Sequence, residues 1–275
     1  MNFRAIKRDS LELLCRNFGQ ATVVFGLTII CSAVCFFIFQ AGVAFGTLGR
    51  DFILDSSPLE VFRNILGADT SDSRKIILPL VAASIFSLFS ITQLRQGITR
   101  WHYILAVHGS AKMSHIFHFF AHGYFRALWF EIIKVFRLGI AVFLCFLPSA
   151  LSLGIGLRFT LDADQVNPLG AQIFTFLALV LGLLGGILYM ILSIRLFLAR
   201  FIFVSDQETS PAEAFRKSNQ IMNGKSASRI ETELSLVGWY ALCLLLLPVS
   251  FVIPLRSICL ANFAREILSE NKKSL

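Results

Sequence analysis

Five histidines, all that the chain contains, fall within 21 residues: His102, His108, His115, His118 and His122. The last three follow at i, i+3 and i+7, a spacing that places three imidazoles on one face of a helix. Imidazoles arranged in this way could bind Zn²⁺ or a haem iron. However, no carboxylate lies nearby in sequence to orient them, and a ligating histidine needs such a partner or a carbonyl. We therefore favour an interfacial helix and predict no bound metal and no cofactor.

Other reactive side chains form no catalytic pattern either. Thr209, Ser210 and Ser218 have no His or Lys at a spacing that implies a triad. Glu131 and Lys134, at i and i+3, are typical of a solvated pair on a helix. The chain contains no phosphate-binding loop, no zinc-protease motif and no glycine-rich nucleotide motif. The sequence therefore predicts no catalytic residues and no enzyme.

The composition is that of a membrane protein. Hydrophobic residues make up 56% of the 275 positions and charged residues only 15%, which leaves too little polar surface to cover a soluble core. Charge-free stretches long enough to cross a bilayer cover residues 17–49, 76–94, 138–157, 165–194 and 234–255. These features predict an all-α fold, a polytopic bundle of transmembrane helices with amphipathic helices at the interface.

Lysine and arginine are distributed unevenly along the chain. If the N-terminus lies inside and the chain crosses six times, 20 of the 25 Lys and Arg residues fall on inner segments. This asymmetry follows the positive-inside rule and places both termini in the cytoplasm. It also accounts for the net charge of +8, so that we expect the lipid bilayer, and no nucleic acid, as a partner. The expected location is the cytoplasmic membrane.

We predict a single integral membrane domain over residues 1–275. An amphipathic helix over 1–19 lies at the inner headgroup boundary, and an inner loop with a capped helix covers 204–229. Between them we expect six spans, near 20–46, 76–94, 134–157, 169–203, 230–247 and 251–268.

The last of these spans has an alternative. Residues 254–268 could form an interfacial helix, which would leave five spans and an external C-terminus. We favour a sixth span because the polar residues of this segment are scattered around a helical wheel. Arg256 would then lie near its outer end, where its side chain can reach the headgroups.

Two further segments have readable patterns. The inner connection 95–133 is mostly amphipathic and is interpreted as helix. Gly182 and Gly186 have the G-x-x-x-G spacing that lets another backbone approach closely. This pair could form a seam between two copies of the chain or relieve crowding within one bundle, and both readings stay open.

The clearest local pattern lies at residues 210–224. Ser210-Pro211-Ala212-Glu213 is a helix start, with an N-cap, proline at the first position and a capping box. Asn223-Gly224 is the matching stop. The helix between them places Ala214, Ser218, Ile221 and Met222 on one face. We expect this face to dock beneath the bundle, with Gly238-Trp239 as its partner.

These residues belong to a longer pattern with members at Asp206, Ser210, Glu213, Ala214, Ser218, Met222, Gly224, Ser235, Gly238, Trp239, Pro254 and Phe263. This pattern resembles the domain-of-unknown-function-975 family of bacterial integral membrane proteins. The resemblance is strong over 199–268 and weaker over 7–40, and it implies a six-span protein without implying an activity. Leu255 and Ala264 stand where the family usually has tyrosine, so any function of those hydroxyls would be missing here.

The expected function is that of a non-catalytic accessory, scaffold or regulatory bundle, which could act on a membrane protein partner or as a homo-oligomer. A transporter or channel component is one alternative, disfavoured because only Arg195 and Arg256 are ionisable at membrane depth. A membrane-embedded enzyme acting on lipids through the histidine-rich segment is the other.

Overall fold

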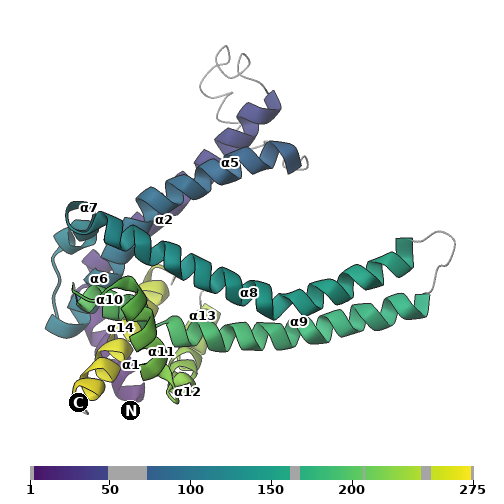
Figure 1. Ribbon diagram of the computed structural model, residues 1–275. Helices are drawn as coiled ribbons and strands as arrows, with labels where there is room; N and C mark the ends of the chain where they lie inside the picture. Colours follow the sequence, from purple (N-terminus) through teal and green to yellow (C-terminus); the bar gives the residue numbers. More distant parts are fainter. Residues whose placement is uncertain (1–2, 49–72, 162–167, 207, 243–248, 274–275) are drawn as a thin grey trace. The chain divides into compact units, whose positions relative to one another are not determined.

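The computed structural model describes residues 3–48, 73–161, 168–206, 208–242 and 249–273, and all regular structure in them is helical (Figure 1). The elements are α1 (Phe3–Arg16), α2 (Phe18–Leu48), α5 (Ser73–Phe86), the π-helix η1 (Ser87–Ile91), α6 (Thr92–His108), the 3₁₀-helix η2 (Met113–Phe117), α7 (His118–Ala121), α8 (Tyr124–Leu161), α9 (Pro168–Leu196), α10 (Ala199–Ser205), α11 (Pro211–Met222), α12 (Ser226–Leu234), α13 (Val237–Leu242) and α14 (Val249–Lys273). The predicted all-α class is confirmed.

The helices form two compact units. Unit 1 comprises residue 1 and residues 129–232 and 267–275, and unit 2 comprises residues 2–128 and 233–266. Each unit is described separately below. The single membrane domain over 1–275 stays a prediction.

In unit 1, α8 and α9 run side by side (Figure 1), and small residues form the seam between them. The Ser149 hydroxyl donates to the Ala178 carbonyl over 2.7 Å. A Cβ at Gly185 would clash with the Cys145 carbonyl, and one at Gly182 would lie 3.1 Å from Ser149 Oγ. A Cβ at Gly186 would meet nothing within 4 Å. Within the chain, Gly182 and Gly185 therefore face α8 and Gly186 does not, and a seam between two copies of the chain stays a prediction.

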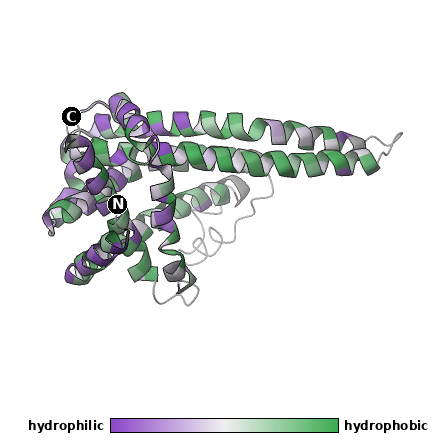
Figure 2. Cartoon of the chain, turned by 90° about the horizontal axis from the view of Figure 1, so that it is seen from below, coloured by the Kyte–Doolittle hydropathy of each residue, from purple (hydrophilic) through white to green (hydrophobic). Residues whose placement is uncertain are grey.

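The outer faces of this pair are apolar and uncovered. Phe136, Phe143, Leu183 and Ile187 are all more than half exposed, and hydrophobic colouring dominates both helices (Figure 2). An exposed apolar surface of this extent is typical of a helix that faces lipid. Three helical segments are long and apolar enough to cross a membrane: Phe18–Ala44, Tyr124–Arg158 and Leu169–Ser205. They correspond to the predicted spans near 20–46, 134–157 and 169–203.

In unit 2, α2 packs closely against α5. A Cβ at Gly42 would overlap Pro79 of α5, so the absence of a side chain at Gly42 brings the two helices together. The predicted span near 76–94 is not one regular helix, because η1 interrupts it before α6 begins. A π-turn of this kind inserts an extra residue into the helical ladder and often bends a helix.

The core of unit 2 joins α14 to α1 and α6. Leu14, Trp101, Leu255 and Ile258 are buried in one hydrophobic cluster. A buried hydrogen bond of 2.8 Å joins Asn262 Nδ2 to Ser10 Oγ, while the Arg265 guanidinium donates to the Ala106 carbonyl of α6. Since α1 and α6 belong to segments predicted on the inner side, these contacts argue against a sixth span over 251–268.

The predicted span near 230–247 is also interrupted. Helix α12 ends at Leu234, a turn follows, and α13 begins at Val237; residues 243–248 lie outside the described residues. The Arg256 guanidinium donates to both carboxylate oxygens of Glu233, over 2.8 and 3.2 Å, and the Tyr240 hydroxyl donates to the same carboxylate over 2.6 Å. Arg256 therefore pairs with a residue at the predicted inner end of this segment, which disagrees with its own expected place near an outer end.

The inner connection 95–133 is not one amphipathic helix. Helix α6 ends at His108, and Gly109 after it has a φ of 75°, a left-handed conformation that glycine adopts without strain. The chain then folds back, and a Cβ at Gly97 would clash with the Ile116 carbonyl of η2. Gly123, with a φ of 79°, marks a second reversal before α8. The two glycine turns break the helical face that the sequence predicts.

Candidate functional site

Helix α11 begins and ends where the sequence predicts. Ser210 has an extended backbone, and its hydroxyl accepts from the Glu213 N–H over 3.3 Å. Proline follows at position 211, and the helix ends at Met222 before Gly224, whose φ is 80°. The Glu213 carboxylate pairs with Lys217 one turn later, at 3.0 Å. The N-cap, the proline start and the glycine stop are all confirmed.

One face of α11 is completely buried. Ala214, Phe215, Ser218 and Met222 are each 0% exposed, and Ser218 Oγ donates to the Arg195 carbonyl over 2.7 Å. Arg195 lies in the last turn of α9, where helix carbonyls lack a partner of their own. The docking of α11 is therefore confirmed, and its partner is the end of α9.

The predicted partner of α11 was Gly238-Trp239. A Cβ at Gly238 would meet nothing within 4 Å, and the Trp239 ring lies 5.6 Å from that of Phe251. Within unit 1, Ser218 makes its close approach to the Arg195 carbonyl. Gly238 and Trp239 belong to unit 2, so their role as a partner of α11 stays a prediction.

An aromatic stack fixes α11 further. The Phe130 ring lies 4.5 Å from that of Phe203 and 4.8 Å from that of Phe215, both nearly parallel to it. The Arg137 guanidinium lies 5.0 Å above the Phe215 ring. The sequence analysis did not identify Phe215, although it stands next to Ala214 and three residues before Ser218 on the same side of the helix.

We expect Ser210→Ala to loosen α11. The change removes the acceptor for the Glu213 N–H, and a lost N-cap costs about 1 kcal/mol of helix stability. Hydrogen exchange of the α11 amides should become faster, while Ser210→Asp, which retains a capping oxygen, should remain close to wild type. Equal exchange in the alanine and wild-type proteins would show that the cap does not support the helix.

Asp206 organises the turn that leads into α11. Its carboxylate accepts from the Thr209 hydroxyl and, over 3.0 Å, from the Glu208 N–H. These hydrogen bonds, that from Thr209 first, lower the pKa of Asp206. The family-motif residue at this position therefore has a structural role in ordering the connection between α10 and α11.

The histidines do not share a helical face. His115 lies in η2, His118 opens α7, and His122 follows α7 with an extended backbone. The His118 and His122 rings stack at 5.4 Å, whereas His102 is buried with Nδ1 at 2.9 Å from the Ile98 carbonyl. Within the described ranges, no group of three or more His, Cys, Asp or Glu residues is placed to hold a metal ion. The absence of a bound metal stays a prediction.

The segment that carries these histidines should lose stability in acid. Burial first, and then the positive charge of Arg100, lower the pKa of both His115 and His118. The unfolded chain therefore takes up protons at a higher pH than the folded one, so stability falls as pH drops below about 6.5. Hydrogen exchange over residues 113–122 should be faster at about pH 5 than at about pH 7. The double variant His115→Gln/His118→Gln should reduce this difference in exchange. An unchanged difference would show that these two histidines do not cause the loss of stability in acid.

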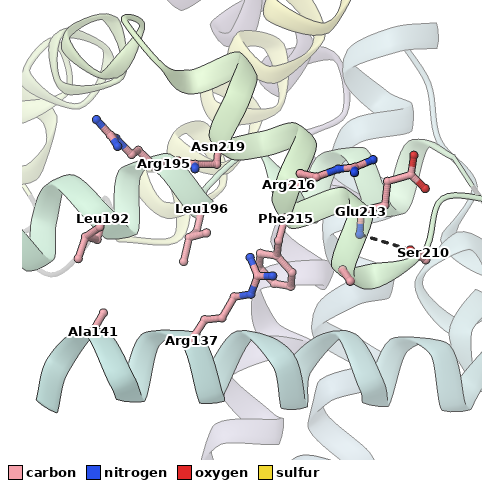
Figure 3. Close-up of a pocket in the computed structure, with 11 residues that line it drawn as sticks. Arg137, Ala141, Leu192, Arg195, Leu196, Ser210, Glu213, Phe215, Arg216 and Asn219 are labelled. Carbon is pink, nitrogen blue, oxygen red and sulfur yellow. Dashed lines mark hydrogen bonds between the residues drawn. The ribbon is translucent and has the colours of Figure 1, made fainter. Parts of the chain in front are cut away.

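A cleft of about 740 Å³ opens beside α11, between α8 and α9 (Figure 3). Its apolar wall consists of Ala141, Leu192 and Leu196, with the Phe215 ring at one side. Its polar lining is formed by Arg137, Arg195, Ser210, Glu213, Arg216 and Asn219. Three guanidinium groups against one carboxylate make this lining positive. Its chemistry suits an anion with an attached apolar group.

The comparisons with known proteins identify the family. The model of the family described as a protein of unknown function (DUF975) matches residues 84–271. The chain belongs to this family. The match begins at residue 84, well before residue 199, where the strong resemblance starts. It does not include residues 7–40. No curated protein and no solved structure matches the chain significantly.

Five DUF975 motif positions lie in unit 2, namely Ser235, Gly238, Trp239, Pro254 and Phe263. Lys7 of α1 donates to the Ser235 carbonyl over 2.9 Å, and its ammonium group lies 5.9 Å from the Trp239 ring. Pro254 and Phe263 are buried in α14. The remaining position is Gly238, which is exposed.

The two departures from the DUF975 pattern are core positions. Leu255 and Ala264 are both 0% exposed in α14. The smaller side chain of Ala264 and the apolar one of Leu255 need no hydrogen-bond partner in this core, whereas a buried tyrosine hydroxyl would need one.

Proposed function

We propose that the chain is an integral protein of the cytoplasmic membrane that works as a non-catalytic scaffold or regulatory bundle. Its partner would be another membrane protein or a second copy of the chain. One observation carries this proposal. In α11 the family-motif residues build and dock a helix: Ser210 caps it, Ala214, Ser218 and Met222 are buried, and Gly224 ends it. Residues with these roles maintain a shape, and an enzyme motif would instead present reactive groups to a substrate.

The proposed topology has both termini inside, with an even number of spans. Six spans follow from the hydropathy, but the contacts of α14 support four. In this arrangement α2 and the segment from Ser73 to Leu94 form one hairpin, and α8 and α9 form the other. The support comes from Asn262, which bonds to Ser10, and from Arg256, which pairs with Glu233. Both partners lie in segments that carry the inner excess of positive charge.

Two other functions remain as alternatives. A transporter or channel component needs a polar path between the hairpins, and a lipid-acting enzyme needs a reactive group near a substrate. The cleft beside α11 would serve the second alternative only if a nucleophile or general base were placed in it. Glu213 is the carboxylate that lines it, and that side chain pairs with Lys217.

Purification of the full chain in mild detergent tests the scaffold proposal. We expect a defined membrane protein, or a second copy of the chain, to co-purify in constant ratio. The variant Ser218→Leu, which disturbs α11, should lose this partner, and Ser218→Ala should retain it. A chain that purifies as a monomer and that turns over lipid, or conducts ions in proteoliposomes, would overturn the proposal.

A further inference from the structure

We propose that the cleft between α8, α9 and α11 binds the headgroup of an anionic glycerophospholipid from the inner leaflet. The phosphate diester would lie against the guanidinium groups of Arg137 and Arg216, and an acyl chain would lie along Ala141, Leu192 and Leu196. This inference rests on the proposed place of α11 at the inner face of the membrane.

The charges of the cleft favour an anion. Its three arginines come from three different helices, and its carboxylate, that of Glu213, pairs with Lys217 at 3.0 Å. The Arg195 guanidinium turns away from Arg137 (Figure 3), so Arg137 and Arg216 are the cations proposed to meet the phosphate. Guanidinium groups bind phosphate oxygens through charge-assisted hydrogen bonds.

Arg137 is positioned before any ligand arrives. Its guanidinium lies 5.0 Å above the ring of Phe215 (Figure 3), and Phe215 is itself held in the stack with Phe130. Stacking on an aromatic face uses the plane of the guanidinium and leaves the N–H groups at its edge able to donate. Less side-chain entropy is then lost when a phosphate binds.

The apolar wall distinguishes a lipid from a soluble phosphate. Leu192 and Leu196 follow each other at i and i+4 on α9, opposite Ala141 of α8 (Figure 3). The same helix continues away from the cleft with exposed apolar residues such as Leu184 and Leu188. A ligand with an acyl chain can therefore bury apolar surface along α9 while its phosphate lies at the cleft. Basic pockets between helices on the cytoplasmic side commonly bind anionic lipid headgroups in this way.

Lipid binding by the full chain in nanodiscs tests the site. Discs of phosphatidylcholine are titrated with phosphatidylglycerol, and retained lipid is measured by native mass spectrometry. Arg137→Gln/Arg216→Gln should weaken the retention of phosphatidylglycerol by roughly thirtyfold, since each lost charge is expected to weaken it about fivefold. The control Arg8→Gln/Arg158→Gln removes two charges outside the cleft and should retain wild-type binding.

A second matched pair avoids the risk that the arginine variants misfold. Asn219 and Gln220 are adjacent and exposed on α11, and Asn219 lines the cleft whereas Gln220 does not. Asn219→Glu should weaken phosphatidylglycerol binding, and Gln220→Glu, with the same added charge, should not.

Three outcomes would overturn the site. The first is an equal loss of binding in the cleft and control variants. The second is full binding by both Arg137→Gln/Arg216→Gln and Asn219→Glu. The third is displacement of the lipid by millimolar inorganic phosphate, which would indicate a soluble ligand. If the wild-type protein is found in the membrane fraction and any of these outcomes is observed, only the lipid site is contradicted. Protein found outside the membrane fraction contradicts the proposed function itself.

Discussion

Replacing Gly185 by alanine is expected to force α8 and α9 apart. A Cβ at this position would overlap the Cys145 carbonyl of the facing helix, and backbone atoms cannot move aside as a flexible side chain can. Overpacking of this kind costs about 1–3 kcal/mol. The hydrogen bond from Ser149 to the Ala178 carbonyl should weaken with the separation. The melting temperature of the protein in detergent should fall clearly.

Gly186→Ala is the matched control for this change. It adds the same methyl group one residue later, where a Cβ would meet nothing within 4 Å. Since alanine favours a helix over glycine by up to about 1 kcal/mol, this variant should be at least as stable as wild type. If the two variants melt at the same temperature, or if Gly186→Ala is the less stable, the seam is not at Gly185.

Replacing Ser218 by leucine should have a second large effect. The side chain is 0% exposed, and its hydroxyl donates to the Arg195 carbonyl over 2.7 Å. Leucine removes this bond and adds volume to a filled contact, at a cost of about 1–3 kcal/mol from overpacking alone. We expect lower yield, a lower melting temperature in detergent and faster proteolysis within residues 204–230.

Ser218→Ala separates the effect of the lost hydrogen bond from that of the added volume. It removes the hydrogen bond without adding volume, so it should cost only about 1 kcal/mol. Protease resistance should decrease in the order wild type, alanine variant and leucine variant. A leucine variant that matches wild type in yield, melting temperature and proteolysis would show that α11 is not docked through Ser218.

Local signals in the sequence predicted α11 well. Ser210, Pro211 and Gly224 act on the backbone within a few residues of themselves, so a capped helix can be recognised without knowledge of its neighbours. Its buried face followed from helical periodicity, apart from Phe215. The three candidate spans followed from hydropathy, which depends on composition and length alone.

Tertiary contacts could not be predicted in the same way. Nothing near Ser218 in sequence names Arg195 as its partner, and the cleft exists only because α8, α9 and α11 meet. Gly182 and Gly186 matched a known spacing, yet the rotation of α9 brings Gly185 to the seam. Spacing identifies a face of a helix, but neighbouring helices decide which residues touch.

The histidine face failed for a local reason. His115 lies in a 3₁₀-helix, His118 begins the short helix α7 and His122 has an extended backbone. Residues at i, i+3 and i+7 align only on a continuous α-helix, and this segment does not form one. The count of six spans is not confirmed, because apolar residues of α14 that match a span are buried against α1 and α6.

Fusions to a reporter that is active only outside the cell test the proposed membrane topology most directly. Fusions after residues 60 and 165, in the connections of the two proposed hairpins, should be active. Fusions after residues 248 and 275 should both be inactive, since four spans leave the whole C-terminal region inside. Activity after residue 248 alone would support six spans, activity after residue 275 would place the C-terminus outside, and either result would contradict the topology proposed here.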